Sequence, residues 1–310
     1  MSSASSLADV VRVLDGLYPP GTAEGWDAVG LVAGDPVAEV RRVLFAVDPV
    51  ADVVDEALEW GADLLVTHHP LFLRGTHSVA ATTFKGSVVH RLVTSGCALH
   101  VAHTNADAAP RGVADALADR VGIAERRPLV AKARAATLAR TTPAGAPGTD
   151  DAGTADAEIG IGRVGTLTEP VTLRDFARRV ADALPATAQG IRFSGDPGAM
   201  VRTAAVVGGS GDSLFDDVRA ADADVYVTSD LRHHPASELR ERARFEAFAT
   251  GRPEAGGTPF LVDTAHFASE WPWLAYAAED LAAGLASGGL PGVETRVSDI
   301  VTDPWTGVAR

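Results

Sequence analysis

The chain has 310 residues, of which 46% are hydrophobic and 22% charged, and this composition is typical of a globular protein with a well-buried core. Its net charge of −14 argues against binding to nucleic acid or to an anionic membrane surface. Residues 1–10 lack the pattern of a signal peptide and no apolar run is long enough to cross a bilayer, so we expect a cytoplasmic protein.

The first 130 residues alternate predicted helices with predicted strands. Apolar residues at helical spacing predict a first helix over residues 7–17, which Pro19-Pro20-Gly21 ends. Cys97, the only cysteine, lies in an apolar stretch, so we expect a buried thiol without a disulfide partner. This alternation is typical of α/β proteins with a largely parallel sheet. Strands are predicted over 43–47, 62–67 and 98–102, and further helices over 52–60, 86–95 and 111–121.

The second half of the chain repeats the order of the first. The apolar run over 62–67 recurs 161 positions later over 223–228, and we infer an internal duplication. A segment rich in Ala, Thr, Gly, Pro and Asp separates the copies, and we expect a low-complexity surface loop there. The predicted organisation is an α/β fold with mixed, largely parallel sheets. It has two related halves, 1–130 and 158–310, joined by the loop 131–157.

A pair of adjacent histidines, His68-His69, directly follows the predicted strand over 62–67. Consecutive side chains of a continuing strand point to opposite faces, so both imidazoles can converge only where the strand has ended, and Pro70 helps to end it. The carboxyl ends of parallel strands are where α/β proteins place ligand sites. Two solvated loop histidines are the alternative interpretation.

Two pairs of a histidine and an acid occupy matching places in the two halves, at an offset of 163. His103 and Asp107 follow one predicted strand, and His266 and Glu270 follow another. At a spacing of four residues, both members lie on one side of a helical turn and can bind one metal ion. Capping of a helix start by the acid is the alternative for either pair alone. Their common offset favours a polynuclear metal site between the halves.

Two glycine-rich segments have the spacing of anion-binding loops. Residues 160–165 match the dinucleotide fingerprint G-x-G-x-x-G, but we predict neither a strand before them nor a helix after them, so we exclude nucleotide binding of that type. Gly209, Ser210 and Gly211 lie between a predicted strand over 204–207 and a predicted helix over 213–220. Their backbone N–H groups could hold an anion, and a tight turn is the alternative.

Further polar residues lie in the second half at the place that corresponds to the histidine pair. Asp230 and His234 follow the predicted strand over 223–228, and we expect them to position ligands or to contact the substrate. An exposed loop is the alternative for His233.

Together these residues resemble the NIF-three-like dinuclear metal centre family, the GTP cyclohydrolase I type 2 homologues. The resemblance covers nearly the whole chain, and the ordered set of motifs is highly specific. The motifs are Trp26-Asp27 with Val29-Gly30-Leu31, Thr67-His68-His69-Pro70-Leu71, Ala102-His103-Thr104-Asn105 with Asp107, Gly208-Gly209-Ser210-Gly211, Thr228 with Asp230, His266 with Glu270, and Asp303-Pro304.

The resemblance implies a centre of two divalent metal ions in each chain. By position, the ligands would be His68, His69, Asp107, His266 and Glu270, with Glu270 as the bridge. His103 would lie just outside the ligands. The resemblance also implies a homo-oligomer, a toroidal hexamer with its metal pairs facing an inner cavity, and an unidentified small-molecule substrate.

The chain departs from the family pattern at three positions that are not ligands. Ala28 replaces an Asn, and Ser229 and Ala265 each replace a Gly. These departures put substrate contacts and loop geometry in doubt rather than metal binding.

Two functions are consistent with such a centre. A metal-dependent hydrolase would use a metal-bridging water against a phosphoester, a nucleotide or a ring amide, and His103 or His234 could transfer the proton. A non-enzymatic metal-binding scaffold or partner-binding oligomer would need the same ligands. Mixed histidine and carboxylate ligands accept zinc, manganese, iron, cobalt or nickel, so the sequence does not name the metal.

Overall fold

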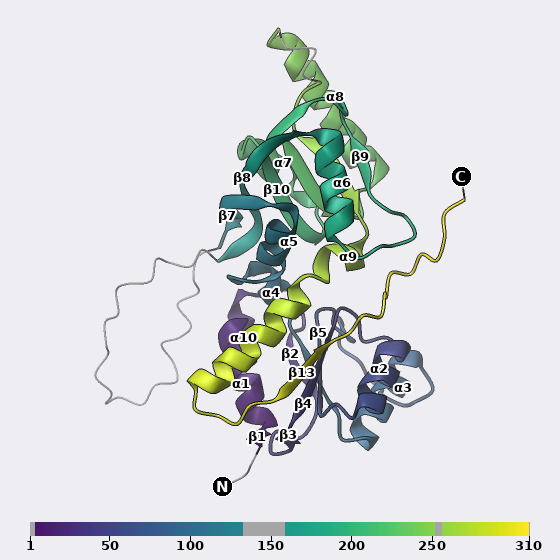
Figure 1. Cartoon of the computed structure of the whole chain (residues 1–310). Helices are drawn as coiled ribbons and strands as arrows, with labels where there is room; N and C mark the ends of the chain where they lie inside the picture. The colour runs from purple at the N-terminus through teal and green to yellow at the C-terminus, as the bar shows by residue number, and fades with distance from the viewer. Residues whose placement is uncertain (1–3, 133–158, 252–255, 310) are drawn as a thin grey trace.

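A computed structural model describes residues 4–132, 159–251 and 256–309. The aliphatic and β-branched runs of the sequence form two larger β-sheets, one above the other in Figure 1, with helices packed on their faces. The predicted α/β class with mixed, largely parallel sheets is confirmed. Among the described helices, none combines the length and the apolar character that crossing a bilayer requires.

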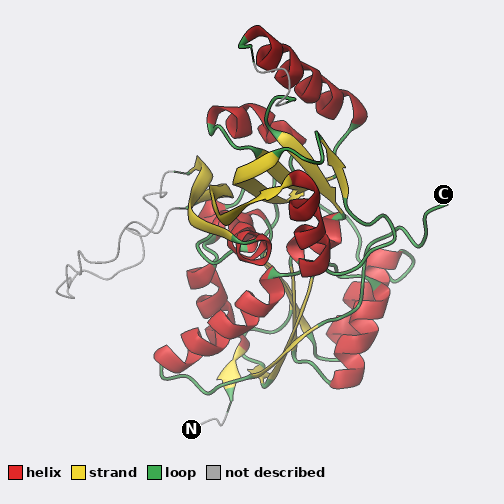
Figure 2. Ribbon diagram, turned by 45° about the horizontal axis from the view of Figure 1, so that its top comes forward, coloured by secondary structure: helices red, strands yellow, loops and turns green. Residues whose placement is uncertain are grey.

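The first sheet has the strand order β13-β4-β5-β6-β2. Its four neighbouring strands β13, β4, β5 and β6 run parallel, and β2 closes one edge antiparallel to β6. Helices α1 and α10 cover one face and α2 and α3 cover the other, as Figure 2 shows. The strands are β2 (Gly30–Ala33), β4 (Arg42–Ala46), β5 (Leu64–Thr67), β6 (Ala98–Val101) and β13 (Glu294–Val297), and the helices are α1 (Leu7–Leu17), α2 (Ala51–Trp60), α3 (Phe84–Thr94) and α10 (Trp273–Ser287).

The second sheet has the strand order β7-β8-β10-β11-β12-β9, and its three strands β10, β11 and β12 run parallel. Helices α5 and α6 pack on one face, while α7 and α8 contribute to the core on the other. The strands are β7 (Ile123–Ala131), β8 (Gly160–Thr172), β9 (Arg192–Ser194), β10 (Met200–Ser210), β11 (Val225–Ser229) and β12 (Phe260–Thr264). The helices are α5 (Val113–Val121), α6 (Leu173–Ala183), α7 (Phe215–Ala220) and α8 (His233–Ala249).

Short elements complete the described chain. Strands β1 and β3 form a separate antiparallel pair near the N-terminus. Two very short helices, α4 and α9, lie where the two sheets approach each other (Figure 1). The remaining elements are β1 (Ser5–Ser6), β3 (Glu39–Val40), the 3-10 helices η1 (Pro20–Thr22) and η3 (Asp212–Leu214), α4 (Thr104–Ala108) and α9 (His266–Glu270).

The inferred duplication is visible in the backbone. Strands β4, β5, β6 and β2 have the same order and directions as β10, β11, β12 and β9. The carboxylate of Asp63 accepts hydrogen bonds from the backbone N–H groups of residues 41 and 42. Asp224, 161 positions later, accepts the same pair of bonds from residues 202 and 203. The two halves therefore share this hydrogen-bonding pattern at equivalent positions as well as the order of their strands.

One continuous apolar core joins the two sheets. Leu7, Val10 and Leu14 of α1 are buried because they recur at helical spacing, and they belong to the same cluster as Val227 of β11 and Trp273 of α10. Two smaller clusters lie under α2 and α3 and under α7 and α8. The shared core holds the carboxyl ends of the two sets of parallel strands against each other.

The sheets cross the predicted boundaries in both directions. Strand β7 ends at Ala131 and pairs with β8 of the second sheet, whereas β13, near the C-terminus, pairs with β4 of the first. The division into halves at 1–130 and 158–310 stays a prediction. Residues 133–158, most of the predicted loop 131–157, lie outside the described residues.

Two local predictions are wrong at their edges. The helix predicted over 111–121 begins only at Val113, because Arg111 has a positive φ of 53° and Gly112 is extended. Gly209 and Ser210 are not in a turn, because β10 continues through them to pair with Ser229 of β11. The segment 160–165 belongs to β8, which continues to Thr172, so the exclusion of a dinucleotide loop is confirmed.

Candidate metal centre

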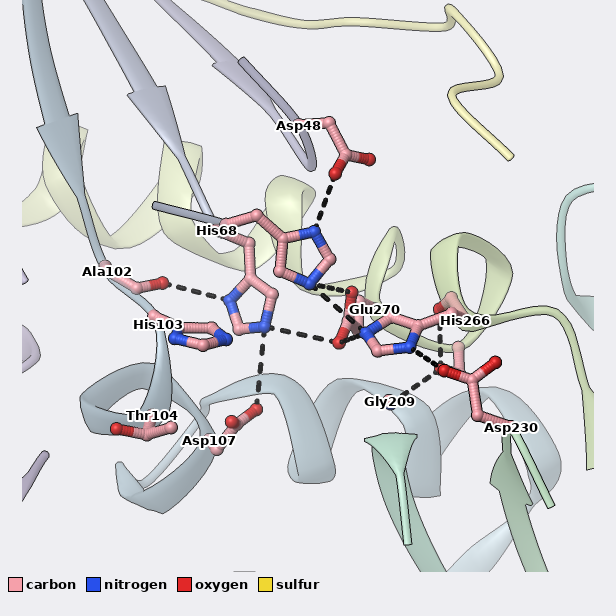
Figure 3. A network of polar contacts seen from close by, with 12 residues as sticks. Asp48, His68, Ala102, His103, Thr104, Asp107, Gly209, Asp230, His266 and Glu270 are labelled. Carbon is pink, nitrogen blue, oxygen red and sulfur yellow. Dashed lines mark hydrogen bonds and ion pairs between the residues drawn. The ribbon is translucent and has the colours of Figure 1, made fainter. Parts of the chain in front are cut away.

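Residues at the carboxyl ends of β4, β5 and β6 in the first sheet and of β10, β11 and β12 in the second form one shared site. Figure 3 shows its side chains. This is the edge at which parallel sheets position functional side chains, because each strand ends there and its next residues are free to turn inward. The residues that follow or end these strands are Asp48 after β4, His68 and His69 after β5, His103 after β6, Gly209 in β10, Asp230 after β11 and His266 after β12.

The tandem histidines converge as predicted. Strand β5 ends at Thr67, and the next two backbone N–H groups bond to the carbonyls of Ala46 (3.1 Å) and Val47 (2.8 Å). The Thr67 hydroxyl donates to the His69 carbonyl at 2.9 Å and fixes the turn. The two imidazole centroids are 5.1 Å apart, so both rings lie on the same side of the ended strand.

Glu270 stands at the centre of the cluster. It lies one helical turn after His266 in α9, and the His266 Nε2–Glu270 Oε1 distance is 2.9 Å. The same oxygen is 3.4 Å from His68 Nε2, while Oε2 is 3.2 Å from His69 Nε2. One buried carboxylate thus contacts three imidazoles, and its two oxygens face different rings.

Each of the four histidines turns its Nε2 atom into the site because an acceptor holds its Nδ1 atom. An Nδ1–H group that donates outward fixes the ring and the tautomer, and it leaves the Nε2 lone pair for a ligand. The four acceptors are the Ala102 carbonyl for His68 (3.0 Å), Asp48 for His69 (2.7 Å), Asp230 for His266 (2.6 Å) and Asp27 for His103 (2.8 Å).

The remaining expected ligand, Asp107, lies on α4 with an oxygen 3.8 Å from His68 Nε2. His103, which the family resemblance places outside the ligands, has a ring nitrogen within 4.8 Å of those of His68 and His69. Its ring centroid is 5.1 Å from that of His68 and 5.5 Å from that of His69. The geometry therefore permits His103 to act as a ligand or as a neighbour of the ligands.

Buried polar atoms in the cluster fit a bound cation. Two sets of donor atoms lie within 4.8 Å of one another, His68 with His69 and His103, and His69 with His266 and Glu270. His68 Nε2 and Glu270 Oε2 are fully buried and form no hydrogen bond among the described residues; their nearest polar contacts are ion-pair distances of 3.4 Å to Glu270 Oε1 and 3.2 Å to His69 Nε2. Leaving such atoms unsatisfied costs about 1–3 kcal/mol each. A metal ion would satisfy both, so the donor set fits divalent metals.

The carboxylates control the charge of the cluster. Burial disfavours the His266 cation, but Glu270 and Asp230 outweigh it and raise the pKa of His266 to about 10. Burial also opposes the His69 cation, yet Glu270 and Asp48 raise the pKa of His69 well above its usual value. Burial disfavours the Glu270 anion, but the surrounding imidazoles hold its pKa well below the usual range. Without metal, protons on the histidines balance this carboxylate.

The pKa of His103 is lowered and that of Asp107 is raised, opposite to the shifts of His69, His266 and Glu270. Burial, aided by the neighbouring His68, lowers the pKa of His103 to about 4, so its ring is neutral near pH 7. Burial raises the pKa of the Asp107 carboxyl to about 6. Both groups are therefore available as unprotonated donors at neutral pH.

Metal binding is expected to release protons near pH 7. The His266 ring, with a pKa of about 10, carries a proton in the metal-free protein, and its Nε2 lies 3.2 Å from His69 Nε2, whose pKa is also raised; a metal ion can bind only the neutral rings. The apparent metal affinity should therefore rise with pH, by about tenfold per pH unit for each proton displaced, until the metal-free pKa is passed. Titration calorimetry in buffers of different ionisation enthalpy measures the protons released. A heat that does not depend on the buffer at pH 7 would contradict this prediction.

The other predicted residues fall into two groups. Asp230 bonds to His266, and Gly209 lies against the ligands: a Cβ atom there would be 2.6 Å from Glu270 Oε1 and 3.0 Å from His266 Nε2. Ser210 is exposed, and the Gly211 carbonyl accepts from the Tyr226 hydroxyl. His234 is exposed in the first turn of α8, where its ring packs against His233.

Replacing Gly209 with alanine is expected to weaken metal binding by about 10- to 100-fold, as do other changes to the surroundings of metal ligands. The new Cβ would overlap Glu270, and the φ of +67° also disfavours any side chain. Gly190→Ala is a matched control, because Gly190 has a φ of +63° and nothing within 4 Å of its Cβ position. Equal metal affinity in the two variants, measured by competition with a chelator, would show that the contact with Glu270 is unimportant.

Sequence patterns missed two carboxylates that orient imidazoles of the cluster. Asp48 holds His69, and Thr302 from the C-terminal segment donates to the other oxygen of Asp48. Asp27 holds His103, and the sequence pointed to it only as part of the Trp26-Asp27 motif. Asp48 could have been found from its position, because it directly follows the predicted strand over 43–47. The neighbouring strands β5 and β6 are likewise followed by site residues, His68 and His103.

The three departures from the family pattern leave the cluster intact. Ala265 has an ordinary extended backbone, with φ of −74° and ψ of 142°, so glycine is not required before His266. Ser229 is fully buried at the end of β11, and the backbone N–H of Ala28 donates to Asp27.

Comparisons with known proteins agree with this architecture. A family model described as Duf34/NIF3 (NGG1p interacting factor 3) matches residues 5–304. A Streptomyces coelicolor protein named GTP cyclohydrolase 1 type 2 homolog is 52% identical over 97% of this chain and 93% of its own length. A Mycobacterium tuberculosis protein of the same name is 37% identical, over 96% of each chain. The crystal structure of a Bacillus cereus protein related to NIF3 has the same fold, with a TM-score of 0.78 at 23% identity over 99% of this chain and 100% of that one.

Proposed function

The chain belongs to the Duf34/NIF3 (NGG1p interacting factor 3) family, and from this we propose that it is a metal-dependent hydrolase with two divalent ions. The single observation that carries the proposal is the convergence of the histidine Nε2 atoms on Glu270, with every Nδ1 atom held from outside. The proposed ligands are His68, His69, Asp107, His266 and Glu270.

Glu270 is suited to bridge two ions because its oxygens face different histidines. Oε2 lies nearest His69, and Oε1 lies nearest His266 and His68. Five protein ligands shared by two ions leave positions for water and for a substrate oxygen, which a purely structural site does not need. When bound, such ions polarise a substrate oxygen and lower the pKa of water.

Within this proposal the chain's own residues position the ions and move a proton. Asp48, Asp230 and Asp27 orient the imidazoles through their Nδ1 atoms. His103 lies against the rings of His68 and His69 and has its Nδ1–H bonded to Asp27, so its Nε2 is the atom that would exchange a proton at the site. We therefore assign proton transfer to His103 rather than to His234, which is exposed on α8.

Hydrolysis is tested with metal-free protein reloaded in turn with zinc, manganese, iron, cobalt and nickel. We expect two ions per chain by elemental analysis, and turnover of phosphoesters, nucleotides or ring amides that chelation abolishes and one metal restores. Full metal occupancy without turnover of any of these compounds would instead support a non-enzymatic metal-binding protein. Light scattering of the same samples tests the proposed homo-oligomer, for which we expect six copies.

A further inference from the structure

Trp26 is an exposed indole at the margin of the proposed metal centre. Trp26 is 59% exposed, although large aromatic residues are usually buried. The indole centroid is 6.0 Å from that of His103, in an edge-to-face arrangement at 75°. His103 in turn contacts the rings of His68 and His69. A single imidazole therefore separates the exposed indole from two proposed ligands.

The backbone that carries Trp26 is held rigidly in place. The next residue, Asp27, accepts hydrogen bonds from His103 Nδ1 (2.8 Å), from the Thr104 backbone N–H (3.0 Å) and from the Thr104 hydroxyl. The same hydroxyl oxygen accepts from the backbone N–H of Glu24 at 2.9 Å. The clamp fixes both sides of Trp26 without burying its ring. Folding thus leaves an exposed apolar side chain on a fixed backbone beside a polar site.

We propose that Trp26 is the stacking surface for a planar heterocycle in the substrate, such as a nucleobase, whose hydrolysable group reaches the metal centre. This inference rests on the proposed function and names the substrate class of that site. An indole face binds planar π-systems, and a rigid ring loses little conformational entropy when it does so. Ligand sites commonly combine such an apolar wall with a few polar groups that fix orientation.

The test compares guanosine 5′-monophosphate with ribose 5-phosphate, which carries the same sugar phosphate without the base. Titration calorimetry with the metal-loaded protein should show tighter binding of the nucleotide. Trp26→Ala should weaken nucleotide binding by about tenfold or more and leave ribose 5-phosphate unchanged, because stacking contributes on that scale for each base. Trp26→Phe keeps an aromatic face and should restore most of the preference.

Phe245→Ala, which removes another exposed aromatic side chain, serves as the control and should bind both compounds like the wild type. Metal content by elemental analysis should be equal in all variants. The inference is overturned if the wild type does not prefer the nucleotide, or if Trp26→Ala retains that preference. If the wild type binds no metal, the proposed function itself is refuted. The failure of this inference and the failure of the proposed function are therefore distinguishable.

Discussion

Replacing Glu270 with glutamine is expected to abolish two-metal occupancy of the centre and, with it, any hydrolytic turnover. Glutamine has nearly the same shape, so the buried position should still be filled. The amide, however, has one oxygen in place of two and carries no charge, whereas Glu270 contacts three imidazoles through both oxygens. Bridging of two cations needs the charge and both oxygens. Elemental analysis of the purified variant measures the metal that remains.

The matched control is Glu238→Gln, an exposed glutamate on α8. It should keep the metal content of the wild type. Unchanged metal stoichiometry in Glu270→Gln would refute the assignment of Glu270. The metal-free variant should also bind metal with release of fewer protons, because Glu270 is what raises the pKa of His69 and His266 most strongly among their neighbours.

Replacing Arg163 with methionine is expected to lower the free energy of unfolding by about 3–5 kcal/mol. Arg163, on β8, is only 3% exposed and forms a two-point ion pair with Asp115 of α5, at 2.8 and 3.0 Å. Its guanidinium also donates to the carbonyls of residues 160, 162 and 109. Methionine would fill the volume but leave the three buried carbonyls without this donor, while Asp115 would keep its bonds from Arg126 Nε (2.7 Å) and from the Arg111 backbone N–H (3.0 Å). Urea unfolding of the metal-free protein measures the difference.

The control is Arg178→Met, the same substitution at an arginine whose ion pair with Asp175, at 3.6 Å, is exposed to solvent. Exposed pairs of this kind contribute at most about 1 kcal/mol, so this control should unfold close to the wild type. A loss below about 1 kcal/mol for Arg163→Met would show that the buried ion pair does not stabilise the contact between α5 and β8.

Local patterns predicted those elements that depend on local periodicity. The helix predicted over 7–17 matches α1 at both ends. Its apolar spacing and its cap at Ser6 both depend on residues close together in the sequence. The extension of β10 through Gly209 was missed, because glycine favours a turn until a neighbouring strand supplies pairing partners. For the same reason the pairing of β13 with β4 could not be foreseen from either segment alone.

The amino-acid sequence by itself determined the central strands of each half, their duplication and the histidines and acids that follow β5, β6 and β12, since these depend on residues close together in the chain. Only the tertiary structure decided which carboxylate orients which histidine. Asp48 lies 21 residues from His69 and Asp27 lies 76 residues from His103, so packing alone selects these partners. It also decided that Glu270 faces three imidazoles at once, because that requires the two sheets to meet with their carboxyl ends opposed around a common core.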